Sequence, residues 1–158
     1  MPVHKPSELP GLLRRGERLL GLDLGEKTIG LAVSDSALGV ASALETLRRT
    51  KFTKDAAALK EIIAARKIGG LVIGLPVNMD GSEGPRARSV RQFAANLEEI
   101  AGLALPIALW DERLSTAAVE RILVEQADMT RKRRGEVVDK MAAAYILQGA
   151  LDALAARR

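Results

Sequence analysis

The sequence predicts an α/β domain built on a mixed five-stranded sheet that is flanked by helices. Three β-type runs follow one another near the N-terminus, and later apolar runs alternate with segments of helical spacing. The order βββαβαβαα favours three antiparallel strands followed by two parallel strands, with helices on the faces of the sheet. No linker divides the 158 residues, of which 47% are hydrophobic, so we expect one domain over residues 17–158.

Residues 1–16 are expected to form a flexible N-terminal arm. They contain Pro2, Pro6 and Pro10 and lack the long apolar stretch of a secretory signal. The single histidine, His4, lies here and the chain has no cysteine, which excludes disulfides, thiolate metal sites and a histidine-centred triad. No run approaches the roughly 20 apolar residues of a membrane span. These features predict a cytoplasmic protein without membrane association.

The first strands are predicted from short β-type runs that turn residues separate. The runs cover residues 18–24, 28–34 and 39–47. Gly25-Glu26-Lys27 and Asp35-Ser36 mark the turns between them. Short connections of this kind favour an antiparallel meander.

The remaining elements alternate between helix and strand. Thr53 is a candidate N-cap, Gly69-Gly70 is expected to end the first helix, and Pro85 suits the first turn of the second helix. The apolar run 71–73 is typical of a strand covered on both faces. The predicted elements are a helix over 53–66, a strand over 71–73, a loop over 74–84, a helix over 85–100, a strand over 106–110, and helices over 115–126 and 136–156.

Three carboxylates belong to segments that we expect to be buried: Asp23, Glu112 and Asp139. An unpaired buried carboxylate costs several kcal/mol or becomes neutral, so a shared divalent cation is the leading interpretation. Ligand sites gather at the carboxyl ends of parallel strands, where Asp23 and Glu112 can meet. The alternatives are a turn cap for Asp23, a solvated charged corner for Glu112, and an acid stabilised by the helix dipole for Asp139.

The helix that carries Asp139 has a face of small and apolar residues. Positions three, four, seven and eleven residues after Asp139 share its face. They are Ala142, Ala143, Ile146 and Ala150. Small residues there allow a close approach to a sheet, which would bring the carboxylate of Asp139 towards the strand ends.

The charge of the chain favours a nucleic-acid partner. The formal net charge is +4, and a basic run of four residues precedes Asp139. This run, made of Arg131, Lys132, Arg133 and Arg134, either contacts phosphates or is a solvated loop. The loop over 76–84 either wraps a phosphate with its N–H groups or is a mobile turn. Aromatic residues make up 3% of the chain, so we expect a nucleic acid to be bound by its backbone rather than by base stacking.

Four segments in order resemble the YqgF family, the Holliday-junction resolvase-like proteins that are also described as pre-16S ribosomal RNA nucleases. They are Gly21-Leu22-Asp23-Leu24-Gly25 with Thr28-Ile29-Gly30, Ile73-Gly74-Leu75-Pro76-Val77-Asn78-Met79-Asp80-Gly81, Asp111-Glu112-Arg113-Leu114-Ser115-Thr116, and Gly135-Glu136-Val137-Val138-Asp139. The resemblance spans about residues 18–150. It implies an RNase H-like fold with Asp23, Glu112 and Asp139 as the acidic active-site positions. It also implies trimming of the 5′ end of the 16S ribosomal RNA precursor, a step of ribosome biogenesis.

The resemblance follows the YqgF pattern rather than the pattern of RuvC-type resolvases. Those resolvases have an acid near the end of the fourth strand, where this chain has Gly74. The second acid must therefore come from the next strand, as Glu112. The resemblance therefore does not imply that this chain cleaves Holliday junctions as RuvC-type resolvases do.

We expect phosphodiester hydrolysis by two Mg²⁺ or Mn²⁺ ions roughly 4 Å apart. Asp23 would bridge the ions, with Glu112 and Asp139 binding from either side. Lys27, Arg113 and Lys140 are candidates for holding the scissile phosphate, and the basic run would extend the grip. The expected partners are precursor ribosomal RNA and the ribosome, for a monomer or a homodimer. Two alternatives stay open: a Holliday-junction resolvase acting on branched DNA, and a catalytically weak RNA-binding or ribosome-associated protein.

Overall fold

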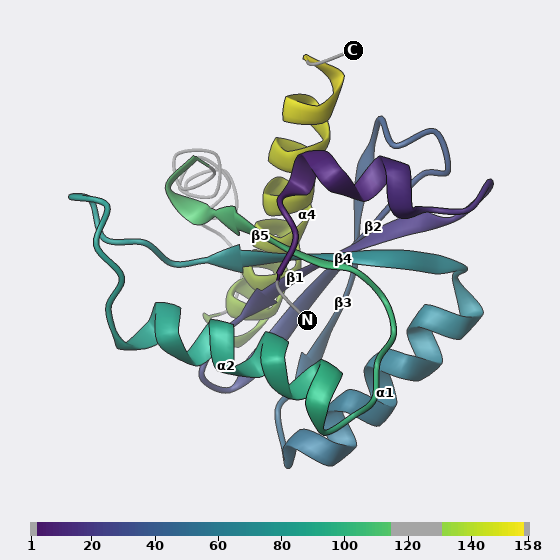
Figure 1. Cartoon of the computed structure of the whole chain (residues 1–158). Coiled ribbons are helices and arrows are strands. Elements are labelled where there is room, and N and C mark those ends of the chain that lie inside the picture. The colour runs from purple at the N-terminus through teal and green to yellow at the C-terminus, as the bar shows by residue number, and fades with distance from the viewer. Residues whose placement is uncertain (1–2, 115–130, 157–158) are drawn as a thin grey trace.

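The computed structural model of the chain describes residues 3–114 and 131–156, with side chains described for 3–113 and 140–156. A five-stranded sheet has helices α1 and α2 packed on one face and helix α4 on the other (Figure 1). The strand order is β3-β2-β1-β4-β5, which confirms the predicted mixed sheet flanked by helices. The elements are η1 (Pro6–Leu12), β1 (Arg18–Leu24), β2 (Thr28–Ser34), β3 (Ala41–Arg48), α1 (Phe52–Ala65), β4 (Ile68–Leu75), α2 (Pro85–Glu99), β5 (Ile107–Asp111), η2 (Glu112–Leu114) and α4 (Arg131–Ala155).

The pairing of the strands decides which residues reach the same edge of the sheet. Strand β1 is antiparallel to β2 and parallel to β4, and β4 is parallel to β5. Leu22 pairs with Ile73 of β4, and Gly74 pairs with Trp110 of β5. The carboxyl ends of β1, β4 and β5 therefore meet at one edge, which is where open α/β sheets bind their ligands.

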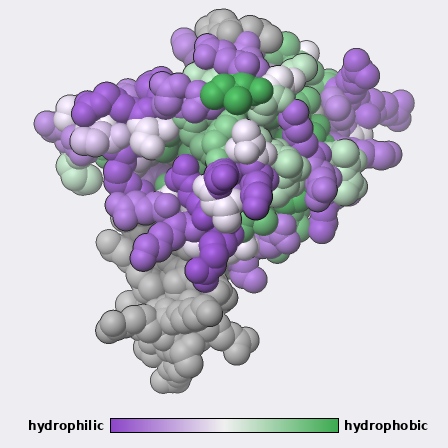
Figure 2. Space-filling model, turned by 90° about the horizontal axis from the view of Figure 1, so that it is seen from below, coloured by the Kyte–Doolittle hydropathy of each residue, from purple (hydrophilic) through white to green (hydrophobic). Residues whose placement is uncertain are grey.

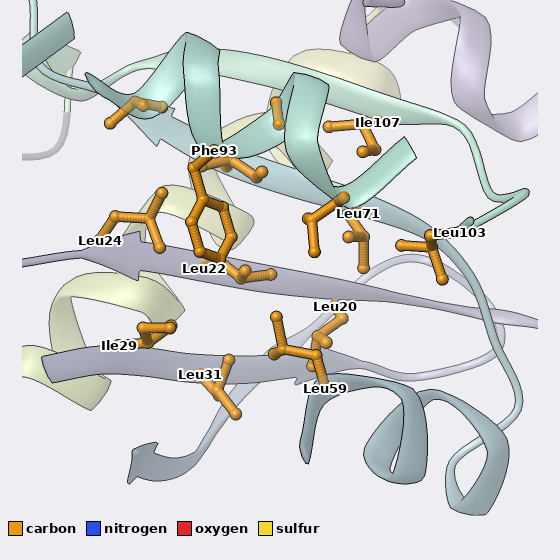
Figure 3. Packing of buried hydrophobic residues seen from close by; sticks show 14 of the residues in the cluster. Leu20, Leu22, Leu24, Ile29, Leu31, Leu59, Leu71, Phe93, Leu103 and Ile107 are labelled. Atoms are coloured by element: carbon orange, nitrogen blue, oxygen red, sulfur yellow. The ribbon is translucent and has the colours of Figure 1, made fainter. Parts of the chain in front are cut away.

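One hydrophobic core lies between the sheet and helices α1 and α2. Leu20, Leu22 and Leu24 of β1 point into this core, together with Leu59 of α1 and Phe93 of α2 (Figure 3). Burying a leucine side chain of this kind contributes about 1.5–3 kcal/mol. The even-numbered residues of β1 are therefore committed to the α1 and α2 face, so the alternation of a strand turns Gly21 and Asp23 towards α4.

Helix α4 packs very closely on β1. A Cβ atom at Gly21 would lie 2.8 Å from Cβ of Leu147 and 3.1 Å from the carbonyl oxygen of Ala143. The glycine leaves the space that the helix backbone fills. The predicted small-residue face of the helix is confirmed where its side chains are described, because Ala143, Ile146 and Ala150 are all buried.

Residues 3–16 pack onto the domain, whereas the sequence analysis expected a flexible arm. Leu9 of η1 is fully buried in the core on the α4 side, and Leu13 packs against the same core. The N–H of His4 donates a hydrogen bond to the carbonyl oxygen of Ile107 (2.8 Å). Two apolar anchors and an edge pairing with β5 thus hold a segment whose prolines predicted little regular structure.

Strand β4 is longer than predicted, since it begins at Ile68 and contains Gly69 and Gly70. The chain turns earlier, at Lys67, which has a positive φ of 54°. A Cβ atom at Gly69 would lie 2.6 Å from a carboxylate oxygen of Glu17. The two glycines therefore lie inside the strand and leave room for the side chains of Leu13, Glu17 and Leu19 instead of ending a helix.

Helices α1 and α4 both begin before their predicted first residues. Helix α1 begins at Phe52, and Lys51 rather than Thr53 is its N-cap. Helix α4 begins at Arg131, so the basic run lies inside this helix instead of in a loop. The predicted helix over 115–126 lies outside the described residues.

The face on the side of α1 and α2 is mostly polar among the described residues (Figure 2). Seen from the side of α1 and α2, hydrophilic side chains cover most of the molecule, with smaller hydrophobic areas between them (Figure 2). Within the described ranges, each helix is too short or too polar to cross a lipid bilayer.

Candidate active site

The ends of three neighbouring parallel strands form the candidate site. Asp23 is the second-last residue of β1, Gly74 is the second-last residue of β4, and Glu112 directly follows the last residue of β5. Because β4 lies between β1 and β5, the side chain of Glu112 has to cross β4 to reach Asp23. Both carboxylates are partly buried.

Gly74 is the residue that leaves room for this crossing. A Cβ atom at position 74 would lie 2.7 Å from Oε1 and 2.9 Å from Cγ of Glu112. It would also lie 2.5 Å from Cδ1 of Ile146 in α4. The side chain of Glu112 therefore lies directly over the backbone of Gly74, on the face of the sheet that α4 covers.

The carboxyl groups of Asp23 and Glu112 are joined by a hydrogen bond. Burial raises the pKa of Glu112 above its ordinary value, and the negative charge of Asp111 acts in the same direction. The hydrogen bond with Asp23 and the positive charge of Arg86 act against this rise. Two carboxyl groups in such contact need either a shared proton or a cation between them. This pair confirms that the topology brings two of the three predicted acids together.

Asp139 lies in α4, and its side chain is outside the described residues. Since α4 begins at Arg131, Asp139 is beyond the first helical turn. The dipole of a helix acts mainly within its terminal turn, so the alternative role as a dipole-stabilised acid loses its basis. Within the described side chains, no group of three or more histidine, cysteine, aspartate or glutamate residues could hold a metal ion. The participation of Asp139 stays a prediction.

Arg113, a predicted phosphate ligand, is held by Asp111 and by the loop after β4. Its Nη2 and Nε donate to Oδ2 of Asp111 at 2.6 and 3.0 Å. Its Nη1 donates to the carbonyl oxygens of Met79 (3.3 Å) and Asn78 (3.4 Å). The hydrogen bonds from Arg113 hold the pKa of Asp111 below its ordinary value. Arg113 thus ties the loop to the end of β5, and a contact with substrate stays a prediction for it.

The other basic candidates lie on two elements. Lys27 is exposed in the turn between β1 and β2, and Lys140 is partly buried in α4. Arg131, Lys132, Arg133 and Arg134 occupy the first turn of α4, with side chains outside the described residues. Their roles in substrate binding stay predictions.

The loop over 76–84 uses several of its N–H groups internally. The N–H of Asn78 donates to the carbonyl oxygen of Ser82, and the N–H of Gly81 donates to that of Asn78, both at 2.9 Å. The N–H of Ser82 donates to Oδ1 of Asp80 (2.9 Å). These three N–H groups are not free to surround a phosphate, which argues against that reading of the loop.

Sequence reasoning missed two features of the site. It noted Gly74 as the position of a missing acid, but not as the space that Glu112 occupies. It considered Arg86 only as a candidate phosphate contact, together with Arg88 and Arg91, and did not connect the charge of Arg86 with Glu112. Pro85 was the available signal, because a proline in the first turn of the helix after β4 places Arg86 near the strand ends.

Known proteins match this chain in sequence. A family model described as "RuvX: Holliday junction resolvase" matches residues 17–153. The chain is 62% identical over 152 residues to the "Putative pre-16S rRNA nuclease" of Paramagnetospirillum magneticum, with 96% of each chain covered. It is 64% identical over 134 residues to the protein of the same name from Roseobacter denitrificans, covering 85% of this chain and 82% of that relative.

Solved structures match the fold at low sequence identity. RuvC of T. thermophilus in complex with a Holliday junction substrate has a TM-score of 0.52 at 16% identity, covering 87% of this chain and 94% of that chain. The Fowlpox virus resolvase in complex with Holliday junction DNA has a TM-score of 0.54 at 6% identity, covering 87% and 98%. At such identities the likeness concerns the fold, and it confirms the predicted RNase H-like architecture.

Proposed function

Because the chain belongs to the RuvX (YqgF) family of Holliday junction resolvase-like proteins, we propose that it is a divalent-metal-dependent endonuclease. Its substrate would be the 16S ribosomal RNA precursor, which it would trim at the 5′ end. The observation that carries this proposal is the joined pair of carboxyl groups, Asp23 and Glu112, at the carboxyl edge of the parallel strands. The names of relatives at about 60% identity favour precursor RNA over branched DNA. The reaction would then take place in the cytoplasm, where ribosomes assemble.

The residues of the pair fit Mg²⁺ or Mn²⁺. Both offer carboxylate oxygens, which are the ligands that these hard cations prefer. Burial raises the pKa of Glu112, so a cation beside this carboxylate would offset the cost of its negative charge, and the space over Gly74 lets its side chain reach Asp23. When bound, two such ions would lower the pKa of the attacking water and offset the negative charge that develops on the phosphate. Asp23, Glu112 and Asp139 would hold them.

Helix α4 is the element that we propose brings Asp139 to the pair. The side chain of Gln148 accepts a hydrogen bond from the N–H of Ala41 (2.8 Å), the first residue of β3, at the edge of the sheet where β1 begins. Ala143 lies against Gly21 in the middle of that strand. The helix therefore runs towards the end of β1 as its residue numbers fall, and Asp139 is about one turn further on.

Several basic side chains would neutralise the phosphates of the bound strand. Among the described side chains, that of Arg86 carries a positive charge that acts on Glu112. Lys27 lies in the turn that follows Asp23, and Lys140 follows Asp139 in α4. The first turn of α4, with its four basic residues, would extend this positive surface along the strand.

The test compares the native protein with Asp23→Asn on two substrates, a precursor RNA fragment with a 5′ extension and a four-way DNA junction. The native protein should cleave the RNA with Mg²⁺ or Mn²⁺ and leave it intact in EDTA. Asp23→Asn should give no product and should be at least as stable, because one of two close carboxylates is removed. Asp152→Asn makes the same chemical change far from the pair and should keep full activity. Full cleavage by Asp23→Asn would defeat the proposal.

Branched DNA is the second candidate substrate, favoured by the description of the family model. Metal-dependent cutting of the junction without cutting of the RNA would establish it in place of RNA trimming. Salt-sensitive RNA binding without metal and without products would instead indicate a binding protein with little turnover.

A further inference from the structure

A small pocket lies at the turn between β1 and β2, where Leu24 and Gly25 directly follow Asp23. Its volume is about 60 Å³, and its polar lining includes Gly25, Glu26, Arg49, Arg86 and Ser89. This is space for roughly two water molecules. A pocket of this size accepts a compact group such as a phosphate rather than a nucleobase.

Arg49 is held in a fixed position at this pocket. Its backbone N–H donates to the carbonyl oxygen of Lys27 (2.8 Å), and its Nη1 donates to that of Gly25 (2.6 Å). Its guanidinium carbon lies 5.5 Å from the centre of the Phe93 ring, in a cation–π contact. A guanidinium has five N–H donors, so a side chain fixed through one of them can present others to a ligand.

Arg86 approaches the pocket from the first turn of α2. It is exposed, and its positive charge also acts on Glu112, so Arg86 connects the lining of the pocket electrostatically with the carboxyl pair. Other arginines nearby are engaged: Arg91 forms an ion pair with Glu83 (2.6 Å), and Arg113 forms one with Asp111.

We propose that Arg49 and Arg86 together bind one backbone phosphate of the nucleic-acid strand, beside the phosphate that is cleaved. This site rests on the proposed function and deepens it, because it adds a contact that positions the strand over the carboxyl pair. Arginine pairs suit the task, since the planar guanidinium donates two parallel hydrogen bonds to phosphate oxygens. The exposed carboxylate of Glu26 stands at the rim and would limit the site to one anion.

A purely structural role is the competing explanation. Arg49 would then serve only to close the turn at Gly25, and Arg86 only to offset the charge of Glu112. These roles predict effects on stability, but no specific contribution to strand binding. The salt dependence of binding separates the two explanations, because each neutralised phosphate of a single strand contributes about 0.7 to the slope of log K against log salt concentration.

The experiment measures fluorescence anisotropy of a labelled single-stranded RNA in EDTA, where cleavage does not run, between about 50 and 200 mM salt. Arg49→Ala and Arg86→Ala should each lower the slope, and the double variant should lower it by about 0.7 in total, because both side chains hold the same phosphate. Arg48→Ala and Arg88→Ala, exposed arginines one and two residues away in the sequence, are the matched controls and should change it less. Equal losses for all four variants would show diffuse charge only and would overturn the proposal.

A second measurement locates the contact on the strand. Single phosphates of the RNA are replaced in turn by neutral methylphosphonates. The native protein should lose affinity at one linkage to which the double variant is indifferent. Identical profiles for the two proteins would contradict the site. Arg49→Lys guards against misfolding, since it keeps the charge and should keep most of the slope.

The outcomes also separate this site from the nuclease proposal. If the native protein cleaves RNA but the slopes do not change, the phosphate site is wrong and the function stands. If the slopes fall as expected but no substrate is cleaved with Mg²⁺ or Mn²⁺, the phosphate site stands and the nuclease proposal fails.

Discussion

Replacing Gly74 by alanine places a methyl group where the side chain of Glu112 crosses β4. The new Cβ would lie 2.7 Å from Oε1 of Glu112 and 2.5 Å from Cδ1 of Ile146. To reach ordinary contact distance, the carboxylate oxygen must move by about 0.7 Å or more. Overpacking of this kind costs about 1–3 kcal/mol, which for a domain of this size lowers the Tm by roughly 2–12 °C. Displacing a catalytic group by about 1 Å costs on the order of 10²-fold in rate.

The assay for Gly74→Ala combines thermal unfolding with metal-dependent cleavage of the precursor RNA fragment. Gly11→Ala is the control, because a Cβ atom there meets nothing within 4 Å. Adding Ile146→Val removes the clash with Cδ1 of Ile146 but leaves the clash with Glu112, so the double variant should regain stability and stay inactive. If the double variant recovers both, the displacement of Glu112 does not explain the loss, and the reasoning is refuted.

Three further predictions concern the frame around the site. Gly21→Ala should lower the Tm, because its Cβ would lie 3.1 Å from the backbone oxygen of Ala143, which a side-chain movement cannot relieve; an unchanged melting curve would show that α4 is not closely seated. Arg113→Lys cannot form the paired hydrogen bonds to the end of β5, so amide exchange in the loop over 76–84 should accelerate while the Tm changes little. Hydrogen bonds from the N–H groups of Val40 and Gly39 lower the pKa of Asp35, so the folded state binds this proton less readily than the unfolded chain. That stabilisation is present at neutral pH and lost as the pH falls through the lowered pKa. In Asp35→Asn, the free energy of unfolding should therefore decrease less steeply as the solution is acidified. The same pH dependence in the variant and the native protein would contradict the assignment.

Local patterns predicted the first two strands well. Residues 18–24 and 28–34 were predicted with the bounds that β1 and β2 have, because apolar runs there end at turn residues on both sides. The same reasoning shortened β4, since Gly69 and Gly70 suggest a stop when they are considered alone. Gly69 instead lies against Glu17 and Gly70 against Leu19, residues about 50 positions earlier, and no local pattern contains these contacts.

The meeting of Asp23 and Glu112 could be predicted because topology alone decides which strand ends share an edge. The geometry within that edge could not be predicted. The role of Gly74 requires the order of three strands and the position of Ile146 on the opposite layer. Arg49, which follows β3, and Arg86, at the beginning of α2, line the same pocket. Neither residue is marked by a spacing or motif in the sequence.

The central claim is that Asp23 and Glu112 bind the same divalent cation. Anomalous diffraction from crystals soaked in Mn²⁺ tests it most directly. We predict a manganese peak within about 2.0–2.6 Å of an oxygen of both carboxylates, with a carboxylate oxygen of Asp139 completing the site. A manganese ion bound elsewhere, or no peak at this edge at metal concentrations that support cleavage, would contradict the account.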